Sequence, residues 1–433
     1  MPTFLDPAPW CQRLRHAAAA VLLAWISGSG GPAAANEAVY SVDSWEAIVA
    51  HAQKVYPALF PGAPTVQPFG DGRSYRYSSG NTIGFQGSQI YLAGPVVGSS
   101  AMTPFQTMDT FCTSTPAACG VTLRRTVTWQ NLEREYIVYV PWAVQKSTRP
   151  VPAVMLIHGS GGNGRVPLNE WGWTSVADRE GLLLVAPSAL VHCYLEDKNG
   201  NGSFELQAEF ELLAKWATGP LGQPVRPLCT AAQLDALLQA NRITAAERAA
   251  ADHPLADDIG GLRQLARILA ADWNADAKRL VVSGFSNGGE MAFRMAAEAS
   301  DVFAAVATAA GAVVQSEYTW PVTPRPLSMV YSIGALNLRG QPVSTTQDVM
   351  ATNSDLASRT AAFLAILGLT DAHTFSNMAI AGFDTGVYVY RSSNRPVPGG
   401  NTLYVGVMAG LEHAYPPTLP ETLWGFFRTQ VLP

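Results

Sequence analysis

The sequence has no dense cluster of lysine or arginine residues. Its 433 residues carry 28 basic and 33 acidic side chains, for a formal net charge of −5. Proteins that bind nucleic acids usually present a basic patch or stripe, so nucleic acid is not expected as a partner. Charged residues make up 14% of the chain and hydrophobic residues 48%, a composition typical of soluble globular proteins. The composition therefore gives no indication of disorder.

The N-terminal region also lacks an apolar run long enough to span a bilayer, which takes about 20 residues. Its apolar segment covers only Ala17–Ile26; it follows Arg13 and Arg15 and precedes small residues that end at Ala35. This order is typical of a secretory signal. We therefore expect residues 1–35 to be a signal peptide, and the mature protein to be extracellular or periplasmic and free of the membrane. A buried helix is the less favoured alternative, because the Gly/Pro/Ala stretch would end it.

Cysteine is scarce, with five residues in the whole chain, and Cys11 lies in the predicted signal peptide. The remaining four, Cys112, Cys119, Cys193 and Cys229, allow three disulfide pairings. Proximity in the sequence favours Cys112–Cys119 and Cys193–Cys229, which suits an oxidising compartment. A zinc site is the weaker alternative, because neither a Cys-x-x-Cys spacing nor a histidine cluster accompanies these residues.

A small α+β module is predicted at residues 36–95. Helical spacing runs over Ser44–Tyr56, and short strands separated by glycines follow at Arg73–Tyr77, Thr82–Phe85 and Gln89–Leu92. The module's aromatic residues either fill its small core, which we favour, or form a polymer-binding face; they are Tyr75, Tyr77, Phe85 and Tyr91. Residues 96–120, rich in Gly, Ser, Thr and Pro, are expected to be a linker.

From residue 121 to residue 433, short apolar runs alternate with helical stretches. This alternation predicts an α/β domain with a doubly wound, mostly parallel sheet. The runs are Tyr136–Val140, Val154–Ile157, Leu182–Val185, Leu280–Val282, Phe303–Ala309, Met329–Ile333 and Leu403–Val407. Residues 191–254 interrupt the rhythm and are too long for an ordinary connection, so we expect an insertion that forms a lid or a binding surface.

The insertion contains a sequence that is similar to part of a calcium-binding loop. Asp197, Asn199 and Asn201 stand at positions 1, 3 and 5 of an EF-hand-type loop, with a glycine at position 6. Position 12, where a bidentate acid is expected, holds Ala208. These residues either bind calcium or form a solvated Asn-Gly turn, which the missing acid favours.

A candidate nucleophile stands in Gly284-Phe285-Ser286-Asn287-Gly288. This segment fits the Gly-x-Ser-x-Gly pattern of a nucleophile elbow, a tight turn between a strand and a helix that exposes the serine oxygen. The apolar run before it and the helical spacing after it are the context that the motif requires. Ser286 is therefore predicted to be a nucleophile.

A serine hydroxyl is a weak nucleophile unless a neighbouring base accepts its proton. His413 follows directly after the last predicted strand, and in hydrolases with this elbow the base comes last in the chain order. We assign His413 as the general base. The alternative, an exposed loop histidine, fits this position less well.

The tetrahedral oxyanion formed by such a nucleophile needs preorganised N–H donors. One donor is expected to be the backbone N–H of Asn287, and the other that of Ser160 or Gly161 in the loop His158-Gly159-Ser160-Gly161-Gly162. His158 is expected to shape this loop without transferring protons. A phosphate-binding loop is excluded because no lysine follows the glycines.

Taken together, the elbow, the His-Gly-Ser-Gly-Gly loop and Gly410-Leu411-Glu412-His413-Ala414-Tyr415-Pro416 resemble a family of secreted bacterial esterases. This family is related to poly(3-hydroxybutyrate) depolymerases and to feruloyl and acetylxylan esterases. The resemblance covers residues 121–433. It implies an α/β-hydrolase fold and hydrolysis of carboxylic esters through an acyl-serine intermediate, with no cofactor required.

The family places its third catalytic residue, an aspartate, where this chain has Asn337. An asparagine can orient a histidine but cannot stabilise the imidazolium as a carboxylate does. Three alternatives follow. Asn337 acts in a weaker role; a carboxylate comes from elsewhere, with Glu317, Asp348 and Asp355 as candidates; or the enzyme is impaired.

The sequence thus predicts a secreted serine esterase, with a polyester such as poly(3-hydroxybutyrate) as the favoured substrate. A feruloyl or acetylxylan ester is the alternative substrate. A catalytically impaired, polymer-binding protein is the alternative from another class, and a serine peptidase or acyltransferase is the weakest candidate. The sequence does not indicate an oligomeric state.

Overall fold

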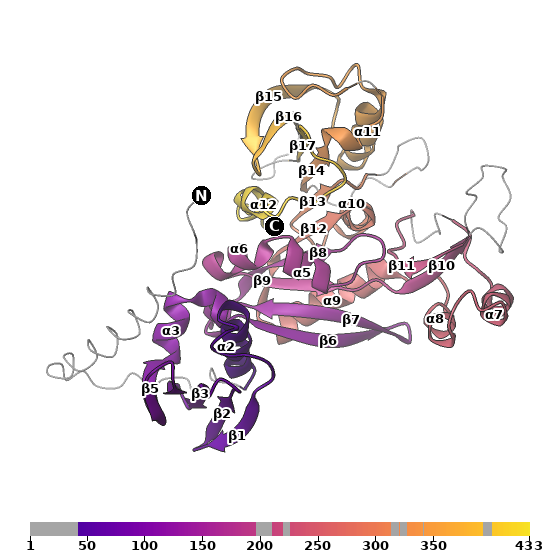
Figure 1. Ribbon diagram of the computed structural model, residues 1–433. Coiled ribbons are helices and arrows are strands. Elements are labelled where there is room, and N and C mark those ends of the chain that lie inside the picture. The colour runs from indigo at the N-terminus through magenta and orange to yellow at the C-terminus, as the bar shows by residue number, and fades with distance from the viewer. Residues whose placement is uncertain are drawn as a thin grey trace, which may run out of the picture. The chain divides into compact units, whose positions relative to one another are not determined.

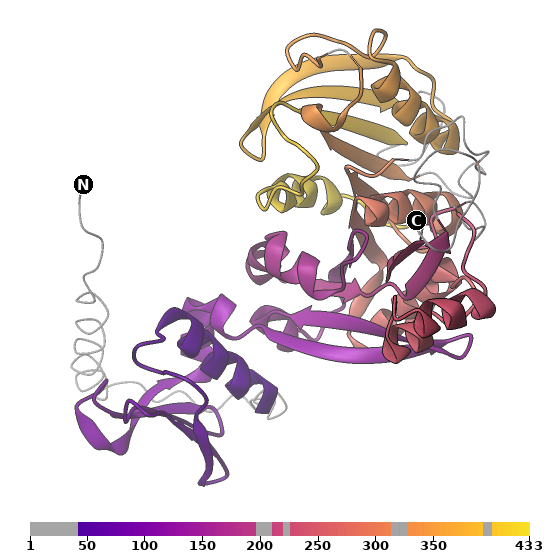
Figure 2. The ribbon, with the colours of Figure 1, turned by 45° about the vertical axis from the view of Figure 1, so that its right-hand side comes forward.

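The structure is a computed structural model that describes residues 42–195, 210–219, 226–312, 320, 327–340, 342–392 and 401–433. The chain divides into two compact units (Figures 1 and 2). The small unit contains the described residues up to Thr122 together with Val140–Lys146. The large unit contains Leu123–Tyr139 and Ser147–Pro433.

The small unit is a five-stranded antiparallel sheet with a helix on one face. The elements are helix α2 Val42–Val55, strands β1 Thr65–Phe69, β2 Gly72–Arg76, β3 Thr82–Gln86, β4 Gln89–Gly94 and β5 Ser99–Thr107, helix α3 Met108–Ser114, the 3₁₀ turn η2 Pro116–Ala118 and helix α4 Trp142–Gln145. The strands pair in chain order, as expected for successive hairpins. Tyr75, Tyr77 and Phe85 are almost fully buried, so these three aromatic residues fill the core and do not form a binding face.

Residues 96–120 differ from the linker expected there. They form the edge strand β5, helix α3 and the turn η2, and their cysteines are buried in the core of the small unit. The predicted disulfide Cys112–Cys119 is present and joins α3 to the residue after η2. β5 is an edge strand, and its side chains are exposed or half-buried. Such a strand tolerates many Ser and Thr residues, and this composition made the segment resemble a loop.

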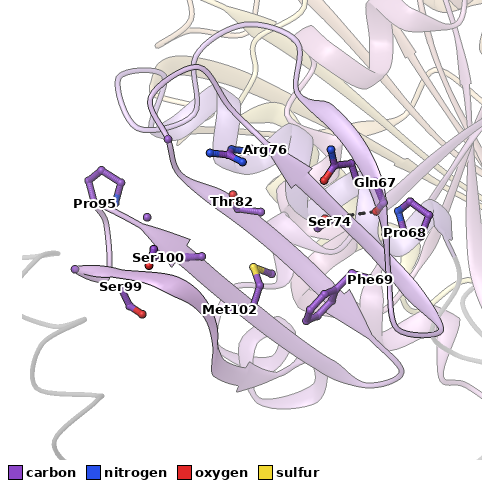
Figure 3. A pocket seen from close by; sticks show the side chains of 14 residues that line it. Gln67, Pro68, Phe69, Ser74, Arg76, Thr82, Pro95, Ser99, Ser100 and Met102 are labelled. Carbon is purple, nitrogen blue, oxygen red and sulfur yellow. Dashed lines mark hydrogen bonds between the residues drawn. The ribbon is translucent and has the colours of Figure 1, made fainter.

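The face of this sheet opposite α2 carries a hollow of about 610 Å³ (Figure 3). Apolar side chains at Phe69 and Met102 lie over Gly84, since a Cβ on that glycine would stand 2.2 Å from Met102 Cε. Around them lie Arg76 and the hydroxyl groups of serine and threonine residues. The hollow is therefore both apolar and polar.

The large unit is built on a ten-stranded sheet in the part of the chain that the structure describes. Its strands are β6 Val121–Trp129, β7 Leu132–Val140, β8 Val151–Ile157, β9 Leu183–Pro187, β12 Ala275–Phe285, β13 Ala305–Ala309, β14 Ser328–Gly334, β15 His373–Ile380, β16 Phe383–Arg391 and β17 Thr402–Met408. Their order is β15-β16-β17-β14-β13-β12-β8-β9-β7-β6.

The central strands of the large sheet, from β9 through β8, β12, β13 and β14 to β17, are all parallel. Antiparallel strands extend both sides, with β7 beside β9 and the hairpin β15–β16 beside β17. Each apolar run found in the sequence lies in or overlaps one of these strands. The fold is an α/β-hydrolase fold, as predicted.

Helices cover both faces of the large sheet (Figures 1 and 2). On one face, α5 Arg165–Glu170, α6 Trp173–Glu180 and α12 Leu419–Phe427 pack into a common apolar cluster with β8 and β9. On the other face lie α9 Asp258–Asp272, α10 Asn287–Ala299 and α11 Ser354–Leu367. There Phe293 of α10 packs edge-to-face on Phe363 of α11, with ring centroids 5.0 Å apart.

The predicted insertion, residues 191–254, has its own elements. Strands β10 Val191–Leu195 and β11 Phe210–Ala214 pair antiparallel, and helices α7 Ala231–Gln239 and α8 Ala245–Ala250 follow. The predicted disulfide Cys193–Cys229 ties β10 to the segment before α7. Because all four of these cysteines are paired, a cysteine zinc site is excluded. The calcium candidates Asp197, Asn199 and Asn201 lie outside the described residues.

Among the described residues, no helix is both long enough and apolar enough to cross a membrane. The predicted signal peptide, residues 1–35, lies outside the described part of the chain.

Candidate active site

Ser286 stands at the turn between β12 and α10, as the elbow motif predicts. Its backbone has φ 55° and ψ −125°, a conformation that residues other than glycine rarely adopt, and its N–H donates to Ala309 O at 2.9 Å. The turn needs glycine at position 288, since a Cβ there would lie 2.1 Å from the carbonyl oxygen of Ile157. The strained turn leaves the Ser286 side chain half-buried at the carboxyl end of β12.

His413 lies in the loop after β17, and its Nε2 atom is 2.8 Å from Ser286 Oγ. Tyr415 anchors this loop: its hydroxyl accepts from Trp173 Nε1 at 3.0 Å and contacts Ser283 Oγ at 3.1 Å. The Tyr415 ring also stacks on Trp171, with centroids 4.2 Å apart. The structure therefore brings together the two residues that the sequence predicted as nucleophile and base.

Two effects lower the pKa of His413 below its ordinary value of 6.5. Burial disfavours the charged imidazolium, and the positive charge of Arg359 on α11 disfavours it further. The neutral ring, which is the form that can accept a proton from Ser286, is thus favoured near neutral pH.

His158, at the start of the glycine-rich loop after β8, is fully buried and held on both ring nitrogens. Its Nδ1–H donates to Gly159 O at 2.7 Å, and Nε2 accepts from the Ala189 N–H at 2.9 Å. Burial lowers the pKa of His158 to about 4. This residue is therefore neutral and shapes the loop, in agreement with the role expected for it.

The structure distinguishes between the two candidates for the second oxyanion donor. The Gly161 N–H donates to Ala214 O at 2.8 Å, so it is not available to a substrate and this candidate is wrong for the conformation described. The Ser160 N–H and the Asn287 N–H form no hydrogen bond with any described residue. These two groups therefore remain as the candidate donors.

The turn that carries Asn337 lies beside the His413 loop. This turn, η4 Ala335–Asn337, follows β14; the Leu336 N–H donates to Leu411 O at 3.1 Å, and a Cβ on Gly334 would stand 2.1 Å from the same oxygen. Yet within the described residues Asn337 forms no hydrogen bond to His413. Its role as the third catalytic residue stays a prediction.

The other carboxylates proposed for the third position are engaged elsewhere or not described. Asp348 lies 2.7 Å from His373 Nε2. Asp355 pairs with Arg359 Nε at 3.0 Å and accepts from the Arg339 N–H at 2.9 Å. Glu317 lies outside the described residues. Among the described residues, no carboxylate is hydrogen-bonded to His413.

Sequence reasoning missed Trp216, which is 1% exposed and contacts both sides of the candidate site. Its partners His158 and Asn287 are 58 and 71 residues away in the sequence. No local motif could reveal these contacts, because the segment reaches the site only through the fold of the insertion. The described residues also contain no group of histidine, cysteine and acidic residues that could hold a metal ion.

Residues 248–385 match the model of the prolyl oligopeptidase family, a span that includes Ser286 but ends before His413. No curated protein sequence matches the chain. Among solved structures, an acetyl xylan esterase from Aspergillus awamori has 14% identity and a TM-score of 0.44, covering 71% of this chain and 99% of its own. An S-formylglutathione hydrolase from Agrobacterium tumefaciens has 13% identity and a TM-score of 0.41, covering 71% and 95%.

Proposed function

We propose that the protein is a serine hydrolase that cleaves carboxylic esters through an acyl-serine intermediate. The observation that carries this proposal is the 2.8 Å contact between Ser286 Oγ and His413 Nε2 at a strained strand-to-helix turn. A serine in this turn, next to a neutral imidazole, has the geometry of an activated nucleophile.

In the proposed reaction, Ser286 Oγ attacks the ester carbonyl carbon while its proton passes to His413 Nε2. The negative charge on the carbonyl oxygen is stabilised by the N–H groups of Asn287 and Ser160. When the bond to the alcohol breaks, His413 gives its proton to the departing oxygen. Water then attacks the acyl-serine, loses a proton to His413 and releases the acid, and the proton returns to Ser286.

This proposal is tested with p-nitrophenyl butyrate and an organophosphonate. We expect turnover and a covalent adduct on Ser286, found by mass spectrometry, and we expect Ser286→Ala to abolish both. His413→Ala should slow turnover and adduct formation, because the serine proton has no acceptor. Absence of turnover and of the adduct in the unaltered protein would refute the esterase function. It would leave a polymer-binding protein with a hydrolase fold.

For the substrate, we propose a polyester, with poly(3-hydroxybutyrate) as the type. The hollow on the small unit supports a polymer of this chemistry (Figure 3). Its 14 lining residues include no aspartate or glutamate that could pair with Arg76. Arginine offers only donors. A polyester chain offers only hydrogen-bond acceptors and apolar groups. A sugar also offers hydroxyl donors, and the hollow contains no carboxylate that could accept from them.

Film binding and product release distinguish the substrates. Ser286→Ala protein should bind a poly(3-hydroxybutyrate) film, and adding Arg76→Gln should weaken this binding several-fold. Arg73→Gln is the matched control, because Arg73 lies on the same strand but pairs with Glu46 of α2 at 3.6 Å. Soluble hydroxybutyrate released by the unaltered protein supports a depolymerase. Ferulate or acetate released from xylan, with no film binding, would support the alternative ester.

A serine peptidase is a second candidate function, which the match to the prolyl oligopeptidase family over residues 248–385 favours. The same acyl-serine could form from an amide. Turnover of a prolyl p-nitroanilide peptide at a kcat/KM above that of p-nitrophenyl butyrate would support this candidate.

We also propose that the protein is secreted after cleavage at Ala35. The two disulfides agree with an oxidising compartment. Sequencing the N-terminus of protein collected outside the cytoplasm tests this proposal, and a mature chain that retains residues 1–35 would contradict it.

A further inference from the structure

The 214–218 segment leads from β11 of the insertion back to the core of the large unit and contacts the oxyanion loop. Ala214 O accepts from the Gly161 N–H at 2.8 Å. Two residues later, the indole Nε1–H of Trp216 donates to His158 O at 2.8 Å, and the indole lies against the His158 ring, with centroids 5.1 Å apart. The loop that carries Ser160 is therefore attached to this segment on both sides of Ser160.

The same segment is also bound to the nucleophile elbow. Asn287 Oδ1 accepts from the Trp216 N–H at 2.8 Å, and Asn287 Nδ2 donates to Trp216 O at 3.4 Å. Asn287 is buried, and its side chain also reaches Glu290 at 3.3 Å. Trp216 thus bridges the two candidate oxyanion donors: its backbone contacts the residue that carries one, and its side chain contacts the loop that carries the other.

Buried charged groups fix the segment beyond Trp216. The Ala217 N–H donates to Asp258 Oδ2 at 2.6 Å, and Ala217 O accepts from Arg294 Nη1 at 2.5 Å. Asp258 forms a buried ion pair with Arg134. Since buried charges without partners are costly, these contacts restrict the segment to one position.

We propose that Trp216 is a positioning residue that sets the spacing between the two oxyanion donors, the N–H groups of Asn287 and Ser160. This inference rests on the proposed ester hydrolysis. The indole N–H holds the His158 carbonyl, and with it the loop that carries Ser160, relative to the elbow. An oxyanion hole is effective only when its donors are preorganised. Trp216 should therefore affect the transition state more than it affects substrate binding.

The test compares Trp216→Phe, which keeps an aromatic ring but loses the donor to His158 O, with Trp424→Phe. Trp424, on α12, is also a buried tryptophan, and it packs in the apolar cluster that α12 forms with α5 and α6. We expect Trp216→Phe to lower kcat for p-nitrophenyl butyrate by about 10- to 100-fold with little change in KM, somewhat less than outright loss of an oxyanion donor. Trp424→Phe is expected to lower the Tm without this loss of kcat.

A second variant, Asn287→Ala, removes the other half of the bridge and keeps the backbone N–H. Both substitutions disturb the same distance between the two oxyanion donors. The fold-loss of kcat in the double variant should therefore be much smaller than the product of the two single fold-losses. Losses that multiply, an unchanged kcat in Trp216→Phe, or an effect on KM alone would overturn the proposal.

Amide hydrogen exchange separates this proposal from the proposed function. In Trp216→Phe, the peptide that covers residues 158–164 should exchange faster than in the unaltered protein, whether or not esters are cleaved. Faster exchange together with no esterase activity in the unaltered protein would show that Trp216 holds this loop and would refute the ester hydrolase. Unchanged exchange in an active esterase would refute the positioning role alone.

Discussion

Replacing Asn337 by aspartate tests whether position 337 is the place of the missing catalytic carboxylate. The turn η4 is held against the His413 loop by the bond from the Leu336 N–H to Leu411 O, at 3.1 Å. Asn337 is half-buried, and its side chain forms no hydrogen bond with any described residue. Asn337→Asp changes one amide to a carboxylate of nearly equal size, so it introduces charge without a new packing demand.

The expected gain is set by how well the new charge stabilises the imidazolium of His413. In a serine protease, the reverse change lowers kcat by about 10⁴-fold, which is an upper limit here. His413 is only partly buried, so solvent screens the new pair. Two unit charges about 4 Å apart attract by ~4 kcal/mol near a protein surface and by ~1 kcal/mol in bulk water, and the screening brings this pair toward the lower value. A gain of ~1 to 2 kcal/mol corresponds to about 5- to 30-fold in kcat.

The assay is steady-state hydrolysis of p-nitrophenyl butyrate over a range of pH. A carboxylate near the ring favours the imidazolium, so the acid limb of kcat/KM should move to higher pH while kcat at the plateau rises. Asn337→Ala is the control, since it removes the amide and adds no charge. If Asn337→Asp changes neither kcat nor the acid limb, position 337 does not face His413, and Glu317 becomes the remaining carboxylate candidate.

Three further predictions concern other parts of the large unit. Arg359→Gln removes a positive charge that lowers the pKa of His413, so this pKa should rise and the acid limb of kcat/KM should move to higher pH. An acid limb that does not move would show that Arg359 does not influence His413. Replacing both Cys193 and Cys229 by alanine opens a loop of 36 residues and should destabilise the unit by about 4 kcal/mol, measured by denaturant unfolding. Gly288→Ala places a Cβ 2.1 Å from a main-chain oxygen, so loss of soluble or active protein is expected; near-normal kcat would refute the described turn.

The fold of the large unit was predictable because its strands are encoded locally. Each central strand is a short apolar run, and the alternation with helices identifies a parallel sheet covered on both faces. Ser286 and His413 could be placed for the same reason, since each follows a recognisable strand in a fixed chain order. The outer strands β6 and β15 were missed because much of each is exposed and their residues do not form apolar runs.

The remaining features of the site depend on contacts between distant segments. Gly161 and Ser160 were equal candidates as donors until the structure showed that Ala214, from the insertion, accepts the Gly161 N–H. Likewise, Asp348 and Asp355 were reasonable as catalytic acids by chain order alone. The partner of Asp348 is His373 of β15, 25 residues away, and nothing in the local sequence indicates that pairing. Asp355 pairs with Arg359 four residues on in α11, a local contact that the helical spacing could have indicated.

The surroundings of His413 indicate how much transition-state stabilisation the oxyanion donors must provide. Among the described residues, no carboxylate is hydrogen-bonded to His413, and Arg359 makes the imidazolium less favourable. The proton on the histidine is then stabilised less than in a complete triad, so a larger share of catalysis falls to the oxyanion donors. Since Trp216 sets their spacing, Trp216→Phe should lower kcat more than Asn337→Ala does. A larger loss of kcat in Asn337→Ala than in Trp216→Phe would mean that the residue at position 337 orients or stabilises His413.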